Sequence, residues 1–308
     1  MNISCPFNYI GGKFKLLEQL QPLFNEKEVF LDLFAGGGNV GTNSSSSKVI
    51  FNDSNEKLID LIKFIKDTDT DVLLKQIDNI IDEYHLSNTA LYGYSYYDCN
   101  SSKGLAGYNK ERFLKLRDDF NAKVIAGETD YSMLYVLMVF SFNNQIRFNR
   151  KGLFNLPVGK RDFNSKMRSK LVLFSEELKS KDIQFLKKDF RDILLDDFSQ
   201  ETFIYCDPPY LITNATYNEN GMWTDLDEKA LLEFLDQANE KGFSFALSNV
   251  LESKNKRNDI LYNWIKSRGY YCNYLNKSYS NSNYHRKDKN SISEEVLITN
   301  YSVDWRNG

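Results

Sequence analysis

The residues best suited to chemistry in this sequence follow a run of strand-forming residues, TFIYC, at positions 202 to 206. They are Asp207, Pro208, Pro209 and Tyr210. Proline cannot extend a sheet and stiffens the backbone, so this segment turns the Asp207 carboxylate and the Pro208 carbonyl toward one point. Two fixed acceptors can hold both N–H groups of an exocyclic amine and make its nitrogen nucleophilic, while Tyr210 offers a flat face to a base. A base reaches such a site only after leaving its duplex, so the motif predicts base flipping.

A glycine-rich turn forms a second candidate site near the N-terminus. The apolar segment VFLDLF at 29–34 runs into AGGGNVG at 35–41, and the next strand-like segment, KVIFND, ends on Asp53. An acid in that position can accept both ribose hydroxyls of an adenosine, and the glycines allow the backbone to approach a ligand closely. The turn and Asp53 therefore predict an adenosine cofactor. The turn lacks the clean GxGxxG pattern of dinucleotide-binding proteins, but a nicotinamide dinucleotide remains an open alternative.

Basic residues gather in one segment of an otherwise acidic chain. From Arg147 to Lys170 there are eight basic residues and one acid, Asp162, whereas the net charge of the whole chain is −3. That charge excludes a protein that coats nucleic acid over its entire surface, and the basic segment predicts one surface for a polyanion. The alternative interpretation is a solvated helix face.

The composition excludes several other classes of protein. Four cysteines without CxxC spacing and two distant histidines, His85 and His285, give no disulfide framework or metal cluster. Cys206 is more plausible as a small buried strand residue than as a nucleophile, because no histidine is near it in the sequence. No window of 18 to 20 residues is continuously apolar and the N-terminus lacks a signal pattern, so we expect a cytoplasmic protein.

The elements that must position these residues alternate between strand and helix at both ends of the chain, which predicts a doubly wound α/β sheet. Residues 67 to 169 interrupt this alternation. They are polar and helix-prone, with an apolar run at 133–142 that predicts a buried helix and a basic hairpin at 142–163. We therefore expect a domain built from residues 1–66 and 170–308 around an insertion of residues 67–169.

Several motifs stand in an order that resembles the Dam-type, class alpha, DNA adenine-N6 methyltransferases, with the bacteriophage Dam branch most similar. They are NYIGGKFKLL (8–17), FLDLFAGGGNVG (30–41), Asn52-Asp53, QIRFNRKGLFNLPVGKR (145–161), DPPYLIT (207–213), LSN (247–249) and EEVLITNY (294–301). The resemblance implies a Rossmann-like catalytic domain that uses S-adenosylmethionine, with the insertion as the target-recognition domain. It also implies methylation of N6 of a flipped adenine in double-stranded DNA, at GATC or a related site, without a metal.

The resemblance assigns site residues position by position. Asp207, Pro208, Pro209 and Tyr210 would hold the adenine. Contacts with S-adenosylmethionine are implied for Tyr9, Lys13, Asp32, Gly36, Gly38, Asp53, Asp189, Phe190 and Asp207. The turn from Gly36 to Gly38 would wrap the methionine end, and Asp189 with Phe190 would lie beside the adenine of the cofactor. For Lys13 the alternative is a surface lysine at the start of a helix.

The same resemblance assigns DNA contacts to the hairpin. Phe142 would wedge into the space left by the flipped base, Asn143 would meet the orphaned partner base, and Arg147 would donate to O6 and N7 of a guanine. The predicted DNA-binding set is Phe142, Asn143, Gln145, Arg147, Asn149, Pro157, Lys160 and Arg161, with phosphate contacts from Lys151, Lys160, Lys166 and Arg168. Asn8 and Gln145 depart from the bacterial enzymes, which have a lysine and an apolar residue there.

Three other functions remain open on the sequence. One is methylation of cytosine N4 or of an RNA base, and another is DNA binding by a catalytically silent homologue. A Rossmann dehydrogenase is the third, although nothing in that class explains the Asp-Pro-Pro-Tyr segment. The expected partners are double-stranded DNA and, in a restriction-modification system, a cognate endonuclease that acts separately.

Overall fold

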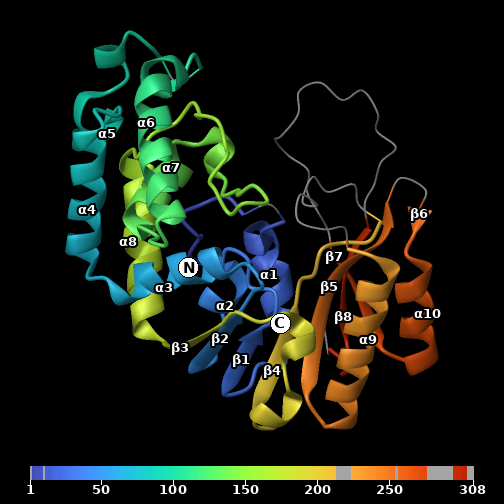
Figure 1. Cartoon of the computed structure of the whole chain (residues 1–308). Helices are drawn as coiled ribbons and strands as arrows, with labels where there is room; N and C mark the ends of the chain where they lie inside the picture. The colour runs from blue at the N-terminus through green and yellow to red at the C-terminus, as the bar shows by residue number, and fades with distance from the viewer. Residues whose placement is uncertain are drawn as a thin grey trace. The chain divides into compact units, whose positions relative to one another are not determined.

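A computed structural model describes residues 2–9, 11–100, 102–212, 223–253, 256–275 and 294–303 (Figure 1). Three residues named above, Ile10, Thr213 and His285, lie outside these ranges. The chain forms two compact units. The first consists of Met1–Gly12, Gly36–Thr42 and Asn55–Lys181, and the second of Lys13–Ala35, Asn43–Ser54 and Asp182–Gly308.

A mixed β-sheet is the framework of the second unit. Its strands run in the order β3-β2-β1-β4-β5-β8-β7, and the short β6 pairs with β5. Strands β1 to β5 are all parallel to one another in this order, whereas β8 is antiparallel to both β5 and β7. The strands are β1 (Val29–Asp32), β2 (Lys48–Asn52), β3 (Asp182–Leu186), β4 (Thr202–Cys206), β5 (Ser244–Ser253), β6 (Lys256–Arg257), β7 (Tyr271–Leu275) and β8 (Glu294–Thr299).

The strand order reverses between β1 and β4, because the chain proceeds from β1 to β2 on one side and from β4 to β5 on the other. Asp32 at the end of β1 lies opposite Tyr205 in β4, so Asp207 follows at the same edge. Open α/β sheets bind ligands at such a switch point, outside the carboxyl ends of the strands. The predicted α/β, Rossmann-like fold is confirmed.

The helices of the second unit begin at recognisable caps. α9 (Asp225–Glu240) starts with a capping box in which Thr224 and Asp227 satisfy each other's backbone N–H groups. α10 (Asp259–Arg268) starts at Asn258 and ends at Gly269, whose positive φ of 69° terminates the helix. The shorter elements are η1 (Lys13–Leu16), α1 (Leu17–Leu20), η2 (Gln21–Leu23), η5 (Phe190–Asp192) and η6 (Leu195–Asp197).

The first unit is mainly helical, as the sequence of its central part predicts. α7 (Tyr131–Phe140) is buried from Met133 onward, which confirms the predicted buried helix and explains why its sequence is apolar on every face. α7 packs against α4 and α6. The remaining elements are α2 (Asn39–Thr42), α3 (Glu56–Asp67), α4 (Thr70–Glu83), α5 (Thr89–Tyr92), η3 (Ser95–Tyr97), α6 (Ala106–Ile125), η4 (Phe142–Asn144) and α8 (Ser165–Ser180).

The predicted basic hairpin is present but has no continuous strands. Two isolated antiparallel bridges hold it, Ser141 to Val158 and Phe148 to Phe154. Asn121 of α6 brackets Phe154, since its side chain accepts the Phe154 N–H at 2.8 Å and donates to the Phe154 carbonyl at 3.1 Å. Side chains therefore supplement the few backbone hydrogen bonds that cross the hairpin.

None of the helices in the described ranges is both long and apolar enough to cross a bilayer. α7, the most apolar helix, has only 10 residues.

Candidate active site

A buried charge cluster lies at the carboxyl edge of the second unit's sheet. The Lys13 Nζ atom is 2.6 Å from Asp207 Oδ1 and 3.4 Å from Glu295 Oε1. The Tyr210 hydroxyl is 3.0 Å from Asp207 Oδ1 and 3.2 Å from Glu295 Oε1. The Lys13 ammonium also lies 4.9 Å from the centre of the Tyr210 ring. Asp207 and Tyr210 are therefore brought together as predicted, with Lys13 between two carboxylates.

The electrostatics of this cluster follow from its burial. The side chains of Lys13, Asp207 and Glu295 are 4 %, 18 % and 0 % exposed. Burial raises the pKa of Asp207 above its ordinary value, the Lys13 ammonium opposes that rise, and the nearby Glu295 carboxylate adds to it. Burial and the two carboxylates also raise the pKa of the Tyr210 phenol well above its usual range, so the phenol stays protonated and can donate.

Lys13 and Glu295 lie deeper in the protein than their sequence context suggests. Lys13 is buried, so the alternative of a surface lysine is wrong. Glu295 was not predicted, although one signal for it exists. It is an acid inside the apolar strand EEVLIT, and β8 is buried from Glu295 onward. Acids are almost never fully buried unless they are paired, so a strand pattern that would bury one points to a partner such as Lys13.

Asn52 joins the ends of three strands of the sheet. Its side chain donates to the Leu33 carbonyl and the Lys188 carbonyl, both at 3.0 Å, and accepts the Lys188 N–H at 3.1 Å. Its own carbonyl accepts the Ala35 N–H at 2.8 Å. The loops after β1, β2 and β3 are thereby fixed to one another. Asp53, which follows Asn52, is half-buried, and Asp32 is buried at the end of β1.

The predicted adenine-side residues have clear structural partners. Asp189 accepts the Arg191 N–H at 2.9 Å and pairs with the Arg191 guanidinium at 3.0 Å, so its side chain caps η5. Phe190 is 3 % exposed and packs against Phe34 and Trp223, with ring centres 5.6 and 5.8 Å apart. Trp223 was not predicted. This aromatic cluster and the Asp53 carboxylate fit a nucleoside, which needs an apolar wall and acceptors for its hydroxyls.

The glycine turn and Tyr9 belong to the first unit. Gly36 and Gly38 have positive φ angles of 52° and 73°. A Cβ atom at Gly36 would lie 2.7 Å from the Tyr9 ring, so a larger residue there would displace the tyrosine. Glycine is therefore required both for the backbone conformation and for the close approach of the ring.

Phe142 is presented at the surface by a strained piece of backbone. It is 52 % exposed, and it is followed by Asn143 and Asn144 with positive φ angles of 57° and 53°. The Asn8 side chain donates to the Asn143 carbonyl at 2.8 Å, and the Asn8 N–H donates to the Asn144 carbonyl at 3.1 Å. Asn8 therefore fixes the backbone that follows Phe142, the predicted wedge. It is one of the two residues that depart from the bacterial pattern.

Two predicted DNA-binding residues, Arg147 and Asn149, make contacts inside the hairpin. Arg147 donates from Nε to the Asn155 side chain at 2.9 Å and from Nη2 to the Asn155 carbonyl at 3.3 Å. Asn149 accepts the N–H groups of Lys151 and Leu153 at 2.9 and 3.1 Å, so it closes the turn. Asn155 was not predicted, and sequence alone gave no signal for it.

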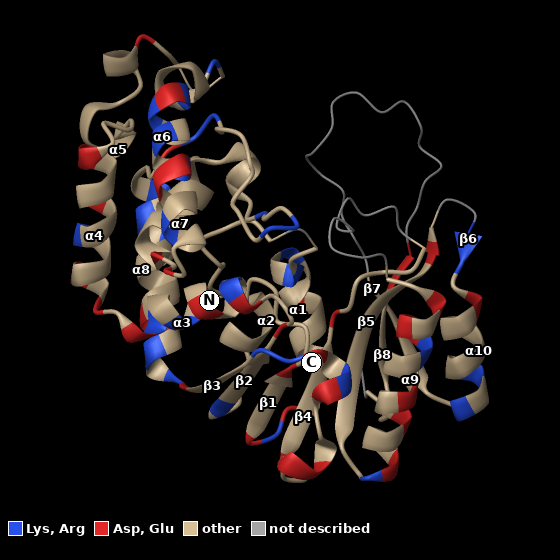
Figure 2. Cartoon of the chain, viewed as in Figure 1, with Lys and Arg blue, Asp and Glu red and all other residues tan. Residues whose placement is uncertain are grey.

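The other predicted DNA-binding residues follow the hairpin backbone. The Pro157 carbonyl accepts the Phe142 N–H at 2.9 Å, the Lys160 carbonyl accepts the Leu105 N–H at 3.1 Å, and Arg161 donates to the Tyr94 hydroxyl at 3.4 Å. Gln145 is half-buried. Figure 2 shows basic residues on the loops that adjoin α6 and α7. Among the predicted phosphate contacts Lys151, Lys160 and Lys166 are exposed, whereas Arg168 pairs with Asp78.

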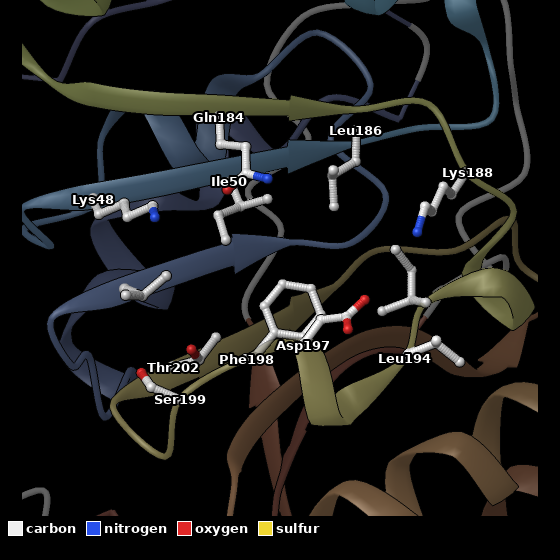
Figure 3. Close-up of a pocket in the computed structure, with 12 residues that line it drawn as sticks. Lys48, Ile50, Gln184, Leu186, Lys188, Leu194, Asp197, Phe198, Ser199 and Thr202 are labelled. Atoms are coloured by element: carbon white, nitrogen blue, oxygen red, sulfur yellow. The ribbon is translucent and has the colours of Figure 1, made fainter.

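A pocket of about 460 Å³ opens on the face of the second unit's sheet (Figure 3). It is lined by residues of β1 to β4 and of the loop before β4, including Ile50, Lys188 and Phe198. No predicted site residue lines it. Cys206 is not suited to act as a nucleophile. Burial raises the pKa of its thiol well above the usual range, so the thiol stays protonated and inert.

A sequence profile decides the family of the chain. The profile of the D12 class N6 adenine-specific DNA methyltransferases matches residues 9–292. The chain belongs to this family. Within the D12 class, it is 39 % identical to the modification methylase StsI of Streptococcus sanguinis and 38 % identical to the type II methyltransferase M.FokI of Planomicrobium okeanokoites.

The D12 relatives differ from this chain in length. The two alignments cover 98 % and 97 % of this chain but only 43 % of either relative. The chain therefore spans less than half the length of these relatives. The DNA adenine methylase of Vibrio cholerae is 28 % identical over 78 % of this chain and 79 % of its own length. The resemblance to adenine-N6 methyltransferases is confirmed, with Dam proteins at lower identity than the type II methylases.

Proposed function

We propose that this protein transfers the methyl group of S-adenosylmethionine to N6 of an adenine flipped out of double-stranded DNA. The proposal rests on the position of Asp207 at the edge of the sheet, in a chain that belongs to a family of adenine-specific DNA methyltransferases. Asp207 stands at the strand-order switch point, and Lys13 and Tyr210 both bind its Oδ1 atom.

The residues of the cluster have separate tasks in this proposal. Lys13 and Tyr210 fix the Asp207 carboxylate, which together with the Pro208 carbonyl accepts the two N–H groups of the adenine amine. This arrangement draws the lone pair of N6 out of conjugation with the ring. Pro209 stiffens the segment, and the Tyr210 ring supports the base. S-adenosylmethionine, when bound, supplies the electrophilic methyl group.

Cofactor binding is proposed first for residues at the carboxyl edge of the sheet. In the second unit, Asp53 would accept the ribose hydroxyls, and the Asn52 contacts would hold the surrounding loops in place. The aromatic cluster of Phe190, Phe34 and Trp223 supports an adenine site at the same edge. The complete proposed set is Tyr9, Lys13, Asp32, Gly36, Gly38, Asp53, Asp189, Phe190 and Asp207.

We assign target recognition to residues 67–169, and within them to the hairpin. Its support is the exposed Phe142 on strained backbone and the guanidinium of Arg147 oriented by Asn155. A bidentate arginine is suited to O6 and N7 of guanine, so the proposed target is GATC or a related site. Two relatives are named as type II or modification methylases, which favours a restriction-modification role with a separate endonuclease.

The test is expression in a host that lacks its own adenine methylase. Genomic DNA would be read by modification-sensitive long-read sequencing and compared with an empty-vector control. We expect N6-methyladenine at one recurring motif. Unmodified DNA with folded protein present would refute the proposal, and incubation with RNA and labelled S-adenosylmethionine would then test the RNA alternative. Methylation at N4 of cytosine would show that the target base is cytosine and not adenine.

A further inference from the structure

Glu228 is a fully buried carboxylate to which the proposed mechanism gives no task. It lies in the first turn of α9, and its side chain accepts three hydrogen bonds. The Trp223 indole N–H donates to Oε2 at 2.7 Å, and the side-chain amides of Asn249 and Asn258 donate to Oε1 at 3.1 and 2.7 Å. Burial raises the pKa of Glu228 above its ordinary value, and these hydrogen bonds oppose the rise. Because a buried carboxylate is costly unless its oxygens are hydrogen-bonded, the three donors hold Glu228 in one orientation.

The orientation of both asparagine amides is fixed by the backbone. The Asn249 side-chain oxygen accepts the Val250 N–H at 2.7 Å. The Asn258 side-chain oxygen accepts the Leu261 N–H at 3.1 Å, at the start of α10. Each amide therefore turns its NH2 group toward Glu228, since its oxygen already accepts a backbone proton. Both NH2 groups meet Oε1, so the other carboxylate oxygen is the acceptor for the indole N–H.

Trp223 belongs to the aromatic cluster proposed above to support the cofactor's adenine. Its ring centre lies 5.9 Å from that of Phe34 at an interplanar angle of 79°, and 5.8 Å from that of Phe190 at 44°. The tryptophan is half-buried, so part of its surface remains exposed. An indole N–H that is held by a carboxylate restricts rotation of the ring. Glu228 therefore fixes the plane in which Trp223 faces the rest of the cluster.

Asn249 connects the same carboxylate to the edge of the sheet. It is the last residue of the LSN motif at 247–249, which has no task in the proposed function. Leu247 of β5 pairs with Cys206, the last residue of β4, and Asn249 follows two positions later at the edge where β4 ends. Glu228 thereby joins the aromatic cluster to the part of the sheet from which the Asp-Pro-Pro-Tyr segment departs.

We propose that Glu228 is a positioning residue that orients Trp223 as one wall of the site for the adenine of S-adenosylmethionine. The carboxylate acts as an acceptor at both of its oxygens, and the two asparagines hold it in place. It does not itself contact the cofactor. This inference deepens the proposed function and rests on it, because it assigns the aromatic cluster to the cofactor.

The test is Glu228→Gln, which changes the hydrogen-bonding pattern at one oxygen only. The glutamine oxygen is expected at the Oε1 position, where it accepts from both asparagines, so the glutamine NH2 group faces the indole N–H and the bond to Trp223 is lost. Isothermal titration calorimetry with S-adenosylhomocysteine, the demethylated cofactor, measures binding without turnover. We expect the dissociation constant to rise about five- to tenfold, the effect of one lost hydrogen bond.

Asn258→Ser is the matched control on the same carboxylate. Serine keeps an N-cap for α10 but removes the amide that donates to Oε1. The variant therefore loses a structural contact of Glu228 and retains the indole contact, so its dissociation constant should stay within about twofold of wild type. Equal weakening by Asn258→Ser and Glu228→Gln would show a general structural role and refute the inference.

Trp223→Phe tests whether Glu228 acts through the tryptophan. Phenylalanine keeps an apolar ring but has no N–H for the carboxylate, so the two positions form a double-mutant cycle. We expect Glu228→Gln to weaken binding of S-adenosylhomocysteine in the wild-type background and to add less than about twofold in the Trp223→Phe background. A full effect of Glu228→Gln in both backgrounds would contradict the proposed role.

Fluorescence gives a measurement that does not depend on a variant at position 228. The chain has three tryptophans, and the difference between wild type and Trp223→Phe isolates the emission of Trp223. We expect S-adenosylhomocysteine to change this emission, because its adenine would lie against the ring. Binding of the ligand without such a change would overturn the inference even if Glu228→Gln failed to fold.

The inference and the proposed function fail in different ways. Methylation of DNA by the wild type, together with unchanged ligand affinity in Glu228→Gln, would overturn the inference alone. A wild type that binds no S-adenosylhomocysteine and methylates no DNA would refute the proposed function, and the inference with it.

Discussion

The charge cluster of the second unit and the hairpin of the first are both polar, yet they are built in opposite ways. In the cluster, side chains from η1, the loop after β4 and β8 meet across long distances in the sequence and are almost completely buried. In the hairpin, Arg147, Asn149 and Asn155 make short-range contacts and remain partly accessible. Chemistry at an amine benefits from charges removed from water, whereas recognition of a duplex requires donors that can reach it.

This difference predicts that the largest loss of stability follows from breaking the cluster. Lys13→Met would leave Asp207 and Glu295 as two buried carboxylates without their cation. We expect the free energy of unfolding to fall by about 3–5 kcal/mol, measured by urea denaturation. Lys15→Met is the matched control, because Lys15 is an exposed residue of the same short helix and its loss should have little effect. Equal effects of the two changes would contradict a buried ion pair.

Removal of the proposed acceptor should affect the reaction while sparing DNA binding. We expect Asp207→Ala to lower the rate of methyl transfer by about 10²–10³-fold, because N6 would lose one of its two oriented acceptors. Affinity for DNA should be retained, since the hairpin belongs to the other unit. Filter binding and transfer of a labelled methyl group measure the two properties separately. A near wild-type rate would show that the acceptor pair is not the basis of catalysis.

A smaller effect, confined to sequence choice, is expected in the hairpin. Arg147→Ala should reduce discrimination between the target and a single-base variant by about 1–3 kcal/mol, as a lost bidentate base contact does. Lys151→Ala is the control on the exposed turn, where loss of the predicted phosphate contact should weaken binding to all sequences equally. Competition binding with both DNA duplexes distinguishes the outcomes. Uniform weakening by Arg147→Ala would make that residue a phosphate contact.

The smallest effect is expected at Asn155, which holds Arg147, the proposed guanine reader. Asn155→Ala leaves Arg147 in place but removes the side-chain oxygen that accepts its Nε proton at 2.9 Å. We expect a loss of discrimination of about 0.5–1.5 kcal/mol, in the range of a single hydrogen bond. The same duplex competition measures it, with Arg147→Ala as the reference. In the double variant the two losses should not add, because both act through one guanidinium.

The sequence predicted those features that depend on local patterns. The parallel strands, a buried helix in the apolar run at 133–142 and the position of Asp207 at a strand end all follow from the spacing of apolar, polar and turn residues. The hairpin was predicted as a turn between strand-like pieces, but isolated bridges stand in place of strands, and the Asn121 contacts that support them follow from no periodicity.

Long-range polar partners could not be predicted in the same way. Glu295 is 282 positions from Lys13 along the chain, and its meeting with Lys13 depends on β8 inserting between β5 and β7. The hydrogen-bond partners of Asn155 and Asn52 could not be predicted either, because an amide side chain is compatible with a surface, a turn or a buried bridge. Which of these it adopts is decided by the partners that the fold brings to it.

The way the hairpin tip is closed has a consequence for the evolution and engineering of target choice. The turn is closed by the Asn149 side chain together with backbone hydrogen bonds from Asn149 to Leu153 and from Gly152 to Asn149, and Asn121 binds both backbone polar groups of Phe154. The residues between these two points form a short segment with fixed ends. Such a segment can be exchanged as a cassette, so a library of tips grafted between positions 149 and 154 would sample new specificities on an unchanged catalytic framework.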